Sequence, residues 1–219
     1  MANPPELTTT SYAILGLLAT RSWTTYELAR QVGRAMGEFW PRAESKLYEE
    51  PKKLVARGLA KASSERVGRR PRTVYSITPA GRRALRTWLP EAGAGPVLEF
   101  EALVKVFFAE HGSRDDLLAT LERVREWAEV RAAAGVALCR EYLEGEGPFP
   151  ERLPWLILTG KFLDEFDAAV LRWVEWAEAQ VREWPEDVRA AAPDWDTLAG
   201  MAARNEAVVR RARERSRAL

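Results

Sequence analysis

Basic side chains are concentrated in one short stretch of this 219-residue chain, between two segments of β-strand character. The stretch runs from Arg66 to Arg72 with the sequence RVGRRPR, and its proline stiffens the tip of the hairpin that we expect there. Four arginines on a hairpin tip have no core to stabilise, and a guanidinium group suits phosphate and guanine edges. This chemistry favours the binding of a polyanion, and the alternative is a set of loop charges that only improve solubility.

A second basic segment precedes the hairpin and has the character of a helix from about Pro41 to Arg57. Proline suits the first turn of a helix, and Gly58 suits the left-handed residue that ends one. Side chains near the start of such a helix can read base edges in the major groove of DNA. An ordinary solvated helix face is the alternative, which Glu49 and Glu50 favour. The candidate DNA contacts are Thr24, Tyr26, Arg42, Ser45, Lys46, Tyr48, Lys52, Arg69, Arg70 and Arg72.

The charges are divided between the two halves of the chain, although the whole chain carries a net charge of only +1. Residues 1–90 hold 16 Lys and Arg against 7 Asp and Glu, a net charge of +9. Residues 91–219 hold 17 against 25, a net charge of −8. This division indicates a basic module joined to an acidic one, and the basic module is the candidate for phosphate contact.

The elements that must position these basic side chains follow from the pattern of the first 90 residues. We expect a helix over Thr10–Thr20, a second helix opened by the capping box Thr24-Thr25-Tyr26-Glu27, and the helix over 41–57. Two short strands follow at 59–63 and 73–77, and a fourth helix opens at Thr78-Pro79 and stops at Pro90. The fold class is therefore mainly α with a small β-hairpin wing, in which residues 1–90 form a winged helix-turn-helix domain.

Residues 91–97 are rich in glycine, alanine and proline and are expected to be a linker to a helical domain over 98–219. Long helices are predicted at 115–143 and 155–184, with apolar stripes longer than two neighbouring helices readily cover, and a last helix starts at about Asp196. The chain has nine tryptophans, which either pack in cores and interfaces or line a pocket for an aromatic ligand. The candidate effector-pocket residues are Phe107, Trp127, Trp173 and Trp176.

The composition gives little support for an enzyme, a metal site or a cofactor. The chain has one cysteine, Cys139, and one histidine, His111, so neither a zinc site nor a nucleophile–base pair assembles readily. A single cysteine also fits a reducing compartment. The longest apolar run near the N-terminus, 12–19, is too short to span a bilayer. We therefore expect no catalytic residues, no metal, no cofactor, no membrane and a cytoplasmic protein.

The order and spacing of several short motifs resemble the PadR family of bacterial transcriptional regulators. The motifs are YAILGLL at 12–18, YEL at 26–28, SKLY at 45–48, and YSITPAG at 75–81, and the FE…FFAE pattern at 100–110 is similar to the longer members of that family. The resemblance implies a homodimer that binds an inverted-repeat DNA operator, usually as a repressor. In some members a phenolic or other small aromatic ligand releases the DNA.

Two other interpretations remain open from the sequence alone. The winged-helix spacing also fits other families such as MarR. Alternatively, the acidic helices form a protein-interaction module and the winged helix does not bind DNA, although the arginine-rich wing argues against this alternative. The run of arginines from Arg204 to Arg217 is interpreted as a solvated tail.

Overall fold

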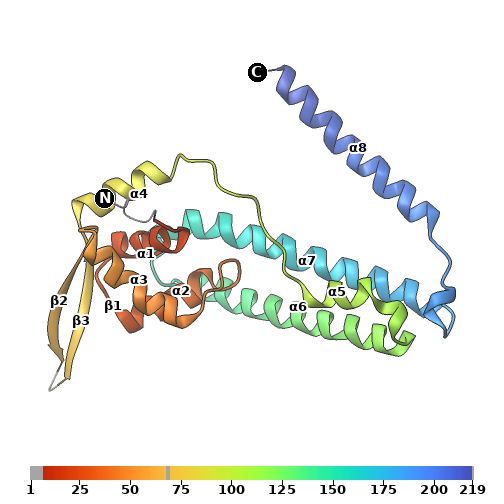
Figure 1. Cartoon of the computed structure of the whole chain (residues 1–219), viewed down its shortest axis with the longest axis horizontal. Coiled ribbons are helices and arrows are strands. Elements are labelled where there is room, and N and C mark those ends of the chain that lie inside the picture. Colours follow the sequence, from red (N-terminus) through yellow and green to blue (C-terminus); the bar gives the residue numbers. More distant parts are fainter. Residues whose placement is uncertain (1–6, 68–69, 219) are drawn as a thin grey trace, which may run out of the picture. The chain divides into compact units, whose positions relative to one another are not determined.

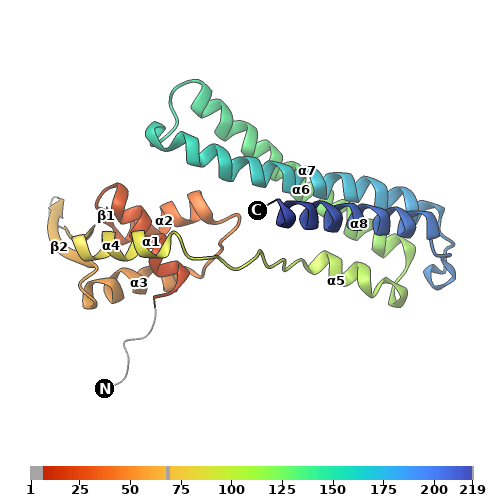
Figure 2. The same ribbon diagram turned by 90° about the horizontal axis from the view of Figure 1, so that it is seen from above.

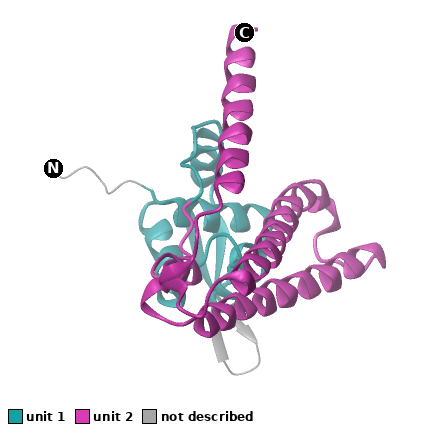
Figure 3. Ribbon diagram, turned by 90° about the vertical axis from the view of Figure 1, so that its right-hand side faces the viewer, with its two compact units in different colours: residues 1–96 teal, residues 97–219 magenta. Residues whose placement is uncertain are grey.

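The computed structural model describes residues 7–67 and 70–218 of the chain. These residues form two compact units, residues 1–96 and residues 97–219, which Figure 3 shows in different colours. Unit 1 contains all three β-strands, and unit 2 is built from helices alone.

Unit 1 combines four helices with a three-stranded antiparallel sheet whose strand order is β1-β3-β2 (Figure 1). Strands β2 and β3 are paired along their whole length, from Ala60↔Ile77 to Val67↔Arg70, and form a hairpin that extends beyond the helices. The elements are α1 (Thr9–Thr20), β1 (Trp23–Thr24), α2 (Thr25–Met36), α3 (Glu44–Ala56), β2 (Ala60–Val67), β3 (Arg70–Ile77) and α4 (Pro79–Trp88).

The core of unit 1 forms where α1, α2 and α3 meet the base of the sheet. Its most deeply buried side chains are Ile14, Leu15, Leu18, Leu28 and Leu54, which come from all three helices. These residues recur at helical spacing, so each helix turns one apolar stripe inward and presents its polar side to solvent. The stripe of α3 also includes Pro51, which is fully buried inside the helix.

The base of the hairpin is joined tightly to the start of α4. Thr78 caps α4 by accepting a hydrogen bond from Gly81 N at 3.1 Å, and its hydroxyl donates to Gly58 O at 2.7 Å. A Cβ atom at Gly81 would lie 2.2 Å from Leu59 O, so only glycine permits this approach. Gly58 has a φ of +70° and ends α3 in the left-handed conformation, as the sequence predicts.

Three details of unit 1 differ from the sequence-based expectation. The third helix begins at Glu44 rather than Pro41, with Ala43 as an N-cap residue that makes no side-chain cap. Both strands are longer than expected, because cross-strand pairing continues through the polar segments that the sequence pattern left to the loop. Strand β1 was not expected, because two residues are too few to show the alternating pattern of a strand. Only its pairing with β3 defines it.

Unit 2 is all-helical and is organised by an antiparallel hairpin of two long helices, α6 and α7, which lie side by side in Figures 1 and 2. Arg114 Nη1 at the start of α6 donates a hydrogen bond to Trp184 O at the end of α7, at 3.0 Å, which fixes the base of the hairpin. The elements are α5 (Glu101–Phe107), η1 (Ala109–His111), α6 (Arg114–Leu143), η2 (Pro150–Arg152), α7 (Leu153–Glu183), η3 (Val188–Ala190) and α8 (Trp195–Arg217).

The buried core of unit 2 occupies only the half of the hairpin next to its base. Its members are Leu117, Leu121, Val124, Ala128, Val170, Val174, Ala177 and Val181. Beyond it, residues 130–143 of α6 and 153–165 of α7, which we call the distal half, expose large apolar side chains: Val130, Val136, Leu138, Leu143, Trp155, Ile157, Leu158 and Phe162. No residue of α8 is buried.

Within the described residues, no helix combines the length and the apolar character needed to cross a membrane.

A candidate nucleic-acid interface

The helix-turn-helix begins with a complete capping box at the N-terminus of α2. Glu27 N donates to Thr24 Oγ1 at 3.2 Å, and Thr24 N donates to Glu27 Oε2 at 2.8 Å. These hydrogen bonds from Thr24, assisted by the positive charges of Arg21 and Arg72, hold the pKa of Glu27 below its ordinary value. The Thr24 hydroxyl also donates to Glu27, so this candidate DNA contact is engaged in the cap.

The inward side of α3 is fixed to α1 by a buried polar pair that the sequence did not reveal. Ser11 Oγ donates a hydrogen bond to Glu50 Oε1, and both residues are more than nine-tenths buried. Lys53 Nζ lies 3.8 Å from the other carboxylate oxygen of Glu50. The sequence had suggested that Glu50 contributes to a solvated helix face. The structure instead buries Glu50, where it helps to hold α3 against α1.

Replacing Ser11 with alanine should destabilise the protein by about 1–3 kcal/mol, because Glu50 would keep a buried carboxylate without its hydroxyl donor. The substitution also removes the Ser11 hydroxyl from the capping box of α1, where Thr8 N donates to it. Urea unfolding of the full chain measures the change, and Ser45→Ala on the exposed side of α3 is the matched control. A loss of stability no larger than that of Ser45→Ala would contradict this role for the pair.

The outward side of α3 carries the residues that the sequence assigns to DNA contact. Ser45, Lys46 and Lys52 are all exposed. Ser45 and Lys52, seven residues apart, lie in line along the helix, and Lys46 lies about 100° around it from Ser45. Arg42 lies before the first turn of α3, where its guanidinium stacks on Trp40 at 3.8 Å from the ring centroid and donates to Pro41 O at 2.6 Å. Arg42 is therefore a flanking residue rather than part of the recognition helix.

Two tyrosines lie on the same pair of helices. Tyr26 on α2 is 64% exposed, so its ring and hydroxyl are open to a ligand. Tyr48 is half-buried, and this partial burial together with a hydrogen bond to Glu44 raises the pKa of its phenol. The Tyr48 hydroxyl thus engages Glu44 in the first turn of α3.

The described part of the wing places arginines on its strands. Arg72 lies on β3 opposite Glu65 of β2, and its Nη2 donates to Glu65 Oε2 at 3.0 Å. Arg70 is the first residue of β3, and Arg69 lies outside the described residues. The prediction of a loop over 66–72 is therefore wrong for residues 66–67 and 70–72, which lie in the paired strands β2 and β3. The charge of Arg72 is partly offset by Glu65, although the side chain is still about half exposed.

The candidate effector residues of unit 2 fall into separate places. Trp127 and Trp173 both lie beside Phe100, with ring centroids at 6.2 and 6.4 Å. Arg131 lies over the ring of Trp127 and forms an ion pair with Asp167 at 2.8 Å, a buried polar group in this aromatic cluster. Phe107, the last residue of α5, instead contacts Phe108, and Trp176 is 45% exposed on α7.

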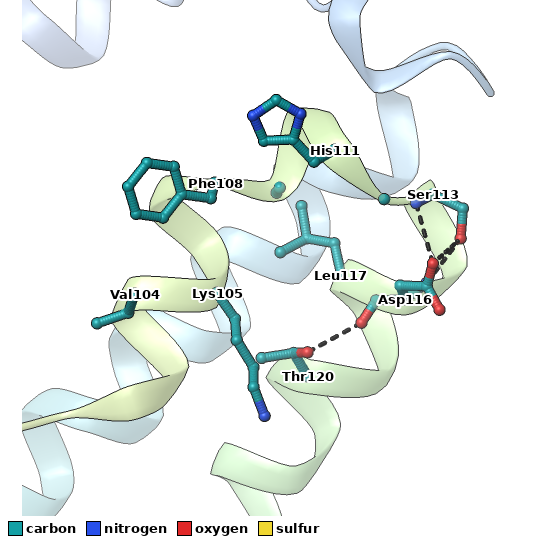
Figure 4. Close-up of a pocket in the computed structure, with 10 residues that line it drawn as sticks. Val104, Lys105, Phe108, His111, Ser113, Asp116, Leu117 and Thr120 are labelled. Atoms are coloured by element: carbon teal, nitrogen blue, oxygen red, sulfur yellow. Dashed lines mark hydrogen bonds between the residues drawn. The ribbon is translucent and has the colours of Figure 1, made fainter.

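A pocket of about 400 Å³ lies between α5, η1 and the start of α6 (Figure 4). Val104, Phe108 and Leu117 supply apolar walls, and Lys105, His111 and Thr120 bring polar groups to its rim. Asp116 is committed to the cap of α6, and its hydrogen bonds with Ser113 lower its pKa. Among the described residues, no group of three His, Cys, Asp or Glu side chains is placed to hold a metal ion.

Two family models match the chain, one in each unit. The model of the PadR-like family of transcriptional regulators matches residues 14–87, which span α1 to α4. The model of the C-terminal region of virulence activator alpha matches residues 100–190, from α5 to η3. Together they account for about three quarters of the chain.

Two curated relatives are similar over the first part of the chain. The negative transcriptional regulator PadR of Bacillus subtilis is 29% identical over 107 residues, which are 48% of this chain and 59% of that protein. A probable transcriptional regulator of Mycobacterium tuberculosis is 31% identical over 81 residues, 36% of this chain and 43% of that protein. The alignments thus span about half the length of these relatives.

Solved structures show the same fold over both units. Bacillus subtilis PadR in complex with operator DNA gives a TM-score of 0.71 at 22% identity, covering 81% of this chain and 99% of that one. The same protein in complex with p-coumaric acid gives 0.65 at 22% identity, covering 80% and 100%. The Vibrio cholerae virulence activator AphA gives 0.60 at 24% identity, covering 80% and 98%. With a winged helix-turn-helix followed by a helical unit and both halves matched, this chain belongs to the PadR-like family of transcriptional regulators.

Proposed function

We propose that this protein is a homodimeric repressor whose two winged helices bind the half-sites of an inverted-repeat operator. The observation that carries this proposal is the outward side of α3, where Ser45, Lys46 and Lys52 are exposed while Leu47, Glu50 and Leu54 seat the helix. The basic wing hairpin belongs to the same unit, and unit 1 holds the excess positive charge. Bacillus subtilis PadR, which shares this fold, has been solved with operator DNA.

The homodimer is supported by the exposed surface of unit 2. The distal half of the α6–α7 hairpin exposes eight large apolar side chains, which is more than a stable monomer usually leaves in one region. Two copies related by a two-fold axis can bury such a surface against each other, because an isologous interface uses the same patch twice. The same symmetry would match an operator with inverted repeats.

A gel shift with DNA from the chain's own promoter region tests the function. We expect a specific complex whose affinity falls steeply with salt, because Lys and Arg contacts with phosphates release counterions. Absence of any DNA complex at low salt, while the protein is folded, would instead favour the rival in which the helical unit binds a protein partner.

Lys46→Ala should relax discrimination at one operator position by about 1–3 kcal/mol if its ammonium meets a base edge. The measurement is binding to the operator and to single-base variants of it, and Lys61→Ala, an exposed lysine on strand β2 rather than on α3, is the control that should leave base preference unchanged. Equal losses of affinity for operator and for random duplex would reassign Lys46 to backbone contact.

We further propose that a small aromatic ligand weakens the DNA complex. Unit 2 carries an aromatic cluster around Phe100 and the pocket at the start of α6, whose apolar walls and polar rim suit a phenolic molecule. Bacillus subtilis PadR has been solved with p-coumaric acid. Adding p-coumaric acid to the same gel shift should reduce the bound fraction, and an unchanged fraction at millimolar concentration would contradict release by this compound.

A further inference from the structure

Helix α8 stands apart from the rest of unit 2 in its lack of packing. It is 23 residues long, yet none of its residues is buried, and Trp195, Leu198, Met201, Val208 and Val209 are all exposed large apolar side chains. It also lies wholly beyond residue 190, where the match to the C-terminal family model ends. The structural match to Bacillus subtilis PadR uses 99% of that protein but only 81% of this chain. The family resemblance therefore does not account for α8.

The helical period puts Leu198, Met201 and Val209 on one side of α8 and so creates a stripe suited to packing on other helices. The distal half of the α6–α7 hairpin carries an apolar surface of similar length, since Val130 to Leu143 spans about 20 Å and Trp195 to Val209 about 21 Å at 1.5 Å per residue. The stripe of α8 and the distal half are therefore two uncovered apolar surfaces of matching length, which are suited to pack against each other.

The net charge of α8 is opposite in sign to that of the helical body as a whole, although the distal half itself, with two Arg, one Lys, one Asp and two Glu, is neutral. Residues 204–217 hold six arginines and two glutamates, a net charge of +4. Residues 97–193 hold 11 Lys and Arg against 20 Asp and Glu, a net charge of −9. The arginine-rich half of α8 is thus complementary to the acidic helical body of this protein, and its charge is the same in sign as that of unit 1.

Helix α8 could pack on the distal half of its own hairpin or on that of a second copy, and the length of the segment that connects α8 to the hairpin decides between the two. Along α7, Trp155 lies about 42 Å from Glu183 at the base. Helix η3 contacts η1, which lies directly before α6, so only residues 191–194 separate the base of the hairpin from α8. Four residues span at most about 17 Å, so Trp195, Leu198 and Met201 stay near the base of their own hairpin.

In an antiparallel two-fold dimer, however, the base of one hairpin lies beside the distal half of the other. We propose that α8 is an exchanged helix, which packs its apolar stripe on the distal half of the partner subunit's α6–α7 hairpin and extends the dimer interface of the proposed function. The inference rests on that homodimer: the distal half of each hairpin is covered by α8 of the other copy.

Cross-linking in the full-length protein tests the exchange, because the single native cysteine, Cys139, is exposed in the distal half of α6. Met201→Cys places a second thiol on the apolar stripe, and a flexible bis-maleimide should join it to the partner subunit's Cys139 and give a covalent dimer on a denaturing gel. The matched control is Ala203→Cys, which faces away from the stripe and should cross-link far less. The double variant Met201→Cys/Cys139→Ala should lose the product.

Two cross-linking results would overturn the exchange. One is a link within a single chain, detected by mass spectrometry of the monomer band. The other is a dimer yield for Met201→Cys no greater than that for Ala203→Cys.

Sedimentation separates this inference from the proposed homodimer. We expect Leu198→Ser/Met201→Ser to raise the dimer dissociation constant by about 100-fold, since removing each buried apolar side chain weakens association by about tenfold or more, while Ala203→Ser leaves it unchanged. A dimer whose dissociation constant is unaffected by the double variant would overturn the exchange and leave the homodimer standing. A wild-type protein that is monomeric at all concentrations would overturn both.

Discussion

A fragment of residues 1–96 should sediment as a monomer and bind the operator at least about 100-fold more weakly than the full chain, because joining two binding modules raises avidity by about 10²–10⁴-fold. The fragment keeps a core of its own, with Ile14, Leu15, Leu28 and Leu54 fully buried, so it should fold. It lacks the exposed apolar surface of the α6–α7 hairpin, which is the proposed dimer interface. Two half-sites on one face of DNA lie about 34–36 Å apart, so a single winged helix reaches only one of them.

The measurements are sedimentation equilibrium and a gel shift on operator and random duplex. Circular dichroism of the fragment is the folding control. A fragment that dimerises and binds as tightly as the full chain would move the interface into unit 1 and leave unit 2 for a ligand or another partner.

Replacing Arg69, Arg70 and Arg72 together with alanine should weaken binding to all DNA sequences by about 100-fold near physiological salt. The log–log salt slope should fall by about 0.9 for each phosphate that the variant no longer neutralises. The effect should be the same for operator and random duplex, because phosphates carry no sequence information. Of the three, Arg72 should contribute least, since it already pairs with Glu65.

Glu65→Ala is the matched control for the triple substitution. It removes the partner of Arg72 and a negative charge from the wing, so DNA binding should stay equal or become tighter. If the triple variant keeps the wild-type affinity and salt slope, the wing does not approach DNA and the recognition helix acts without it.

Much of unit 1 could be predicted from the sequence, because local signals decide where its helices begin and end. Thr24 and Glu27 form the capping box that their spacing predicts, and Gly58 adopts the left-handed conformation that ends α3. The apolar stripes of α1 and α2 predict which of their faces is buried, because a 3.6-residue period has only one inward side. The exposed positions of Ser45, Lys46 and Lys52 follow from the same period.

Contacts between residues far apart in the sequence decided the rest. Glu50 looks like a surface charge in the sequence, and only the packing of α1 on α3 brings Ser11 to its carboxylate and buries both residues. Likewise, β1 exists only because Trp23 and Thr24 pair with Tyr75 and Val74, and the register of β2 and β3 places Arg72 opposite Glu65. The long helices of unit 2 were predicted, but only the folded hairpin shows that burial ends near Ala128 and Phe166 and leaves the distal half and α8 uncovered. A helical period shows which face of a helix is apolar, and only tertiary structure shows how much of that face another segment covers.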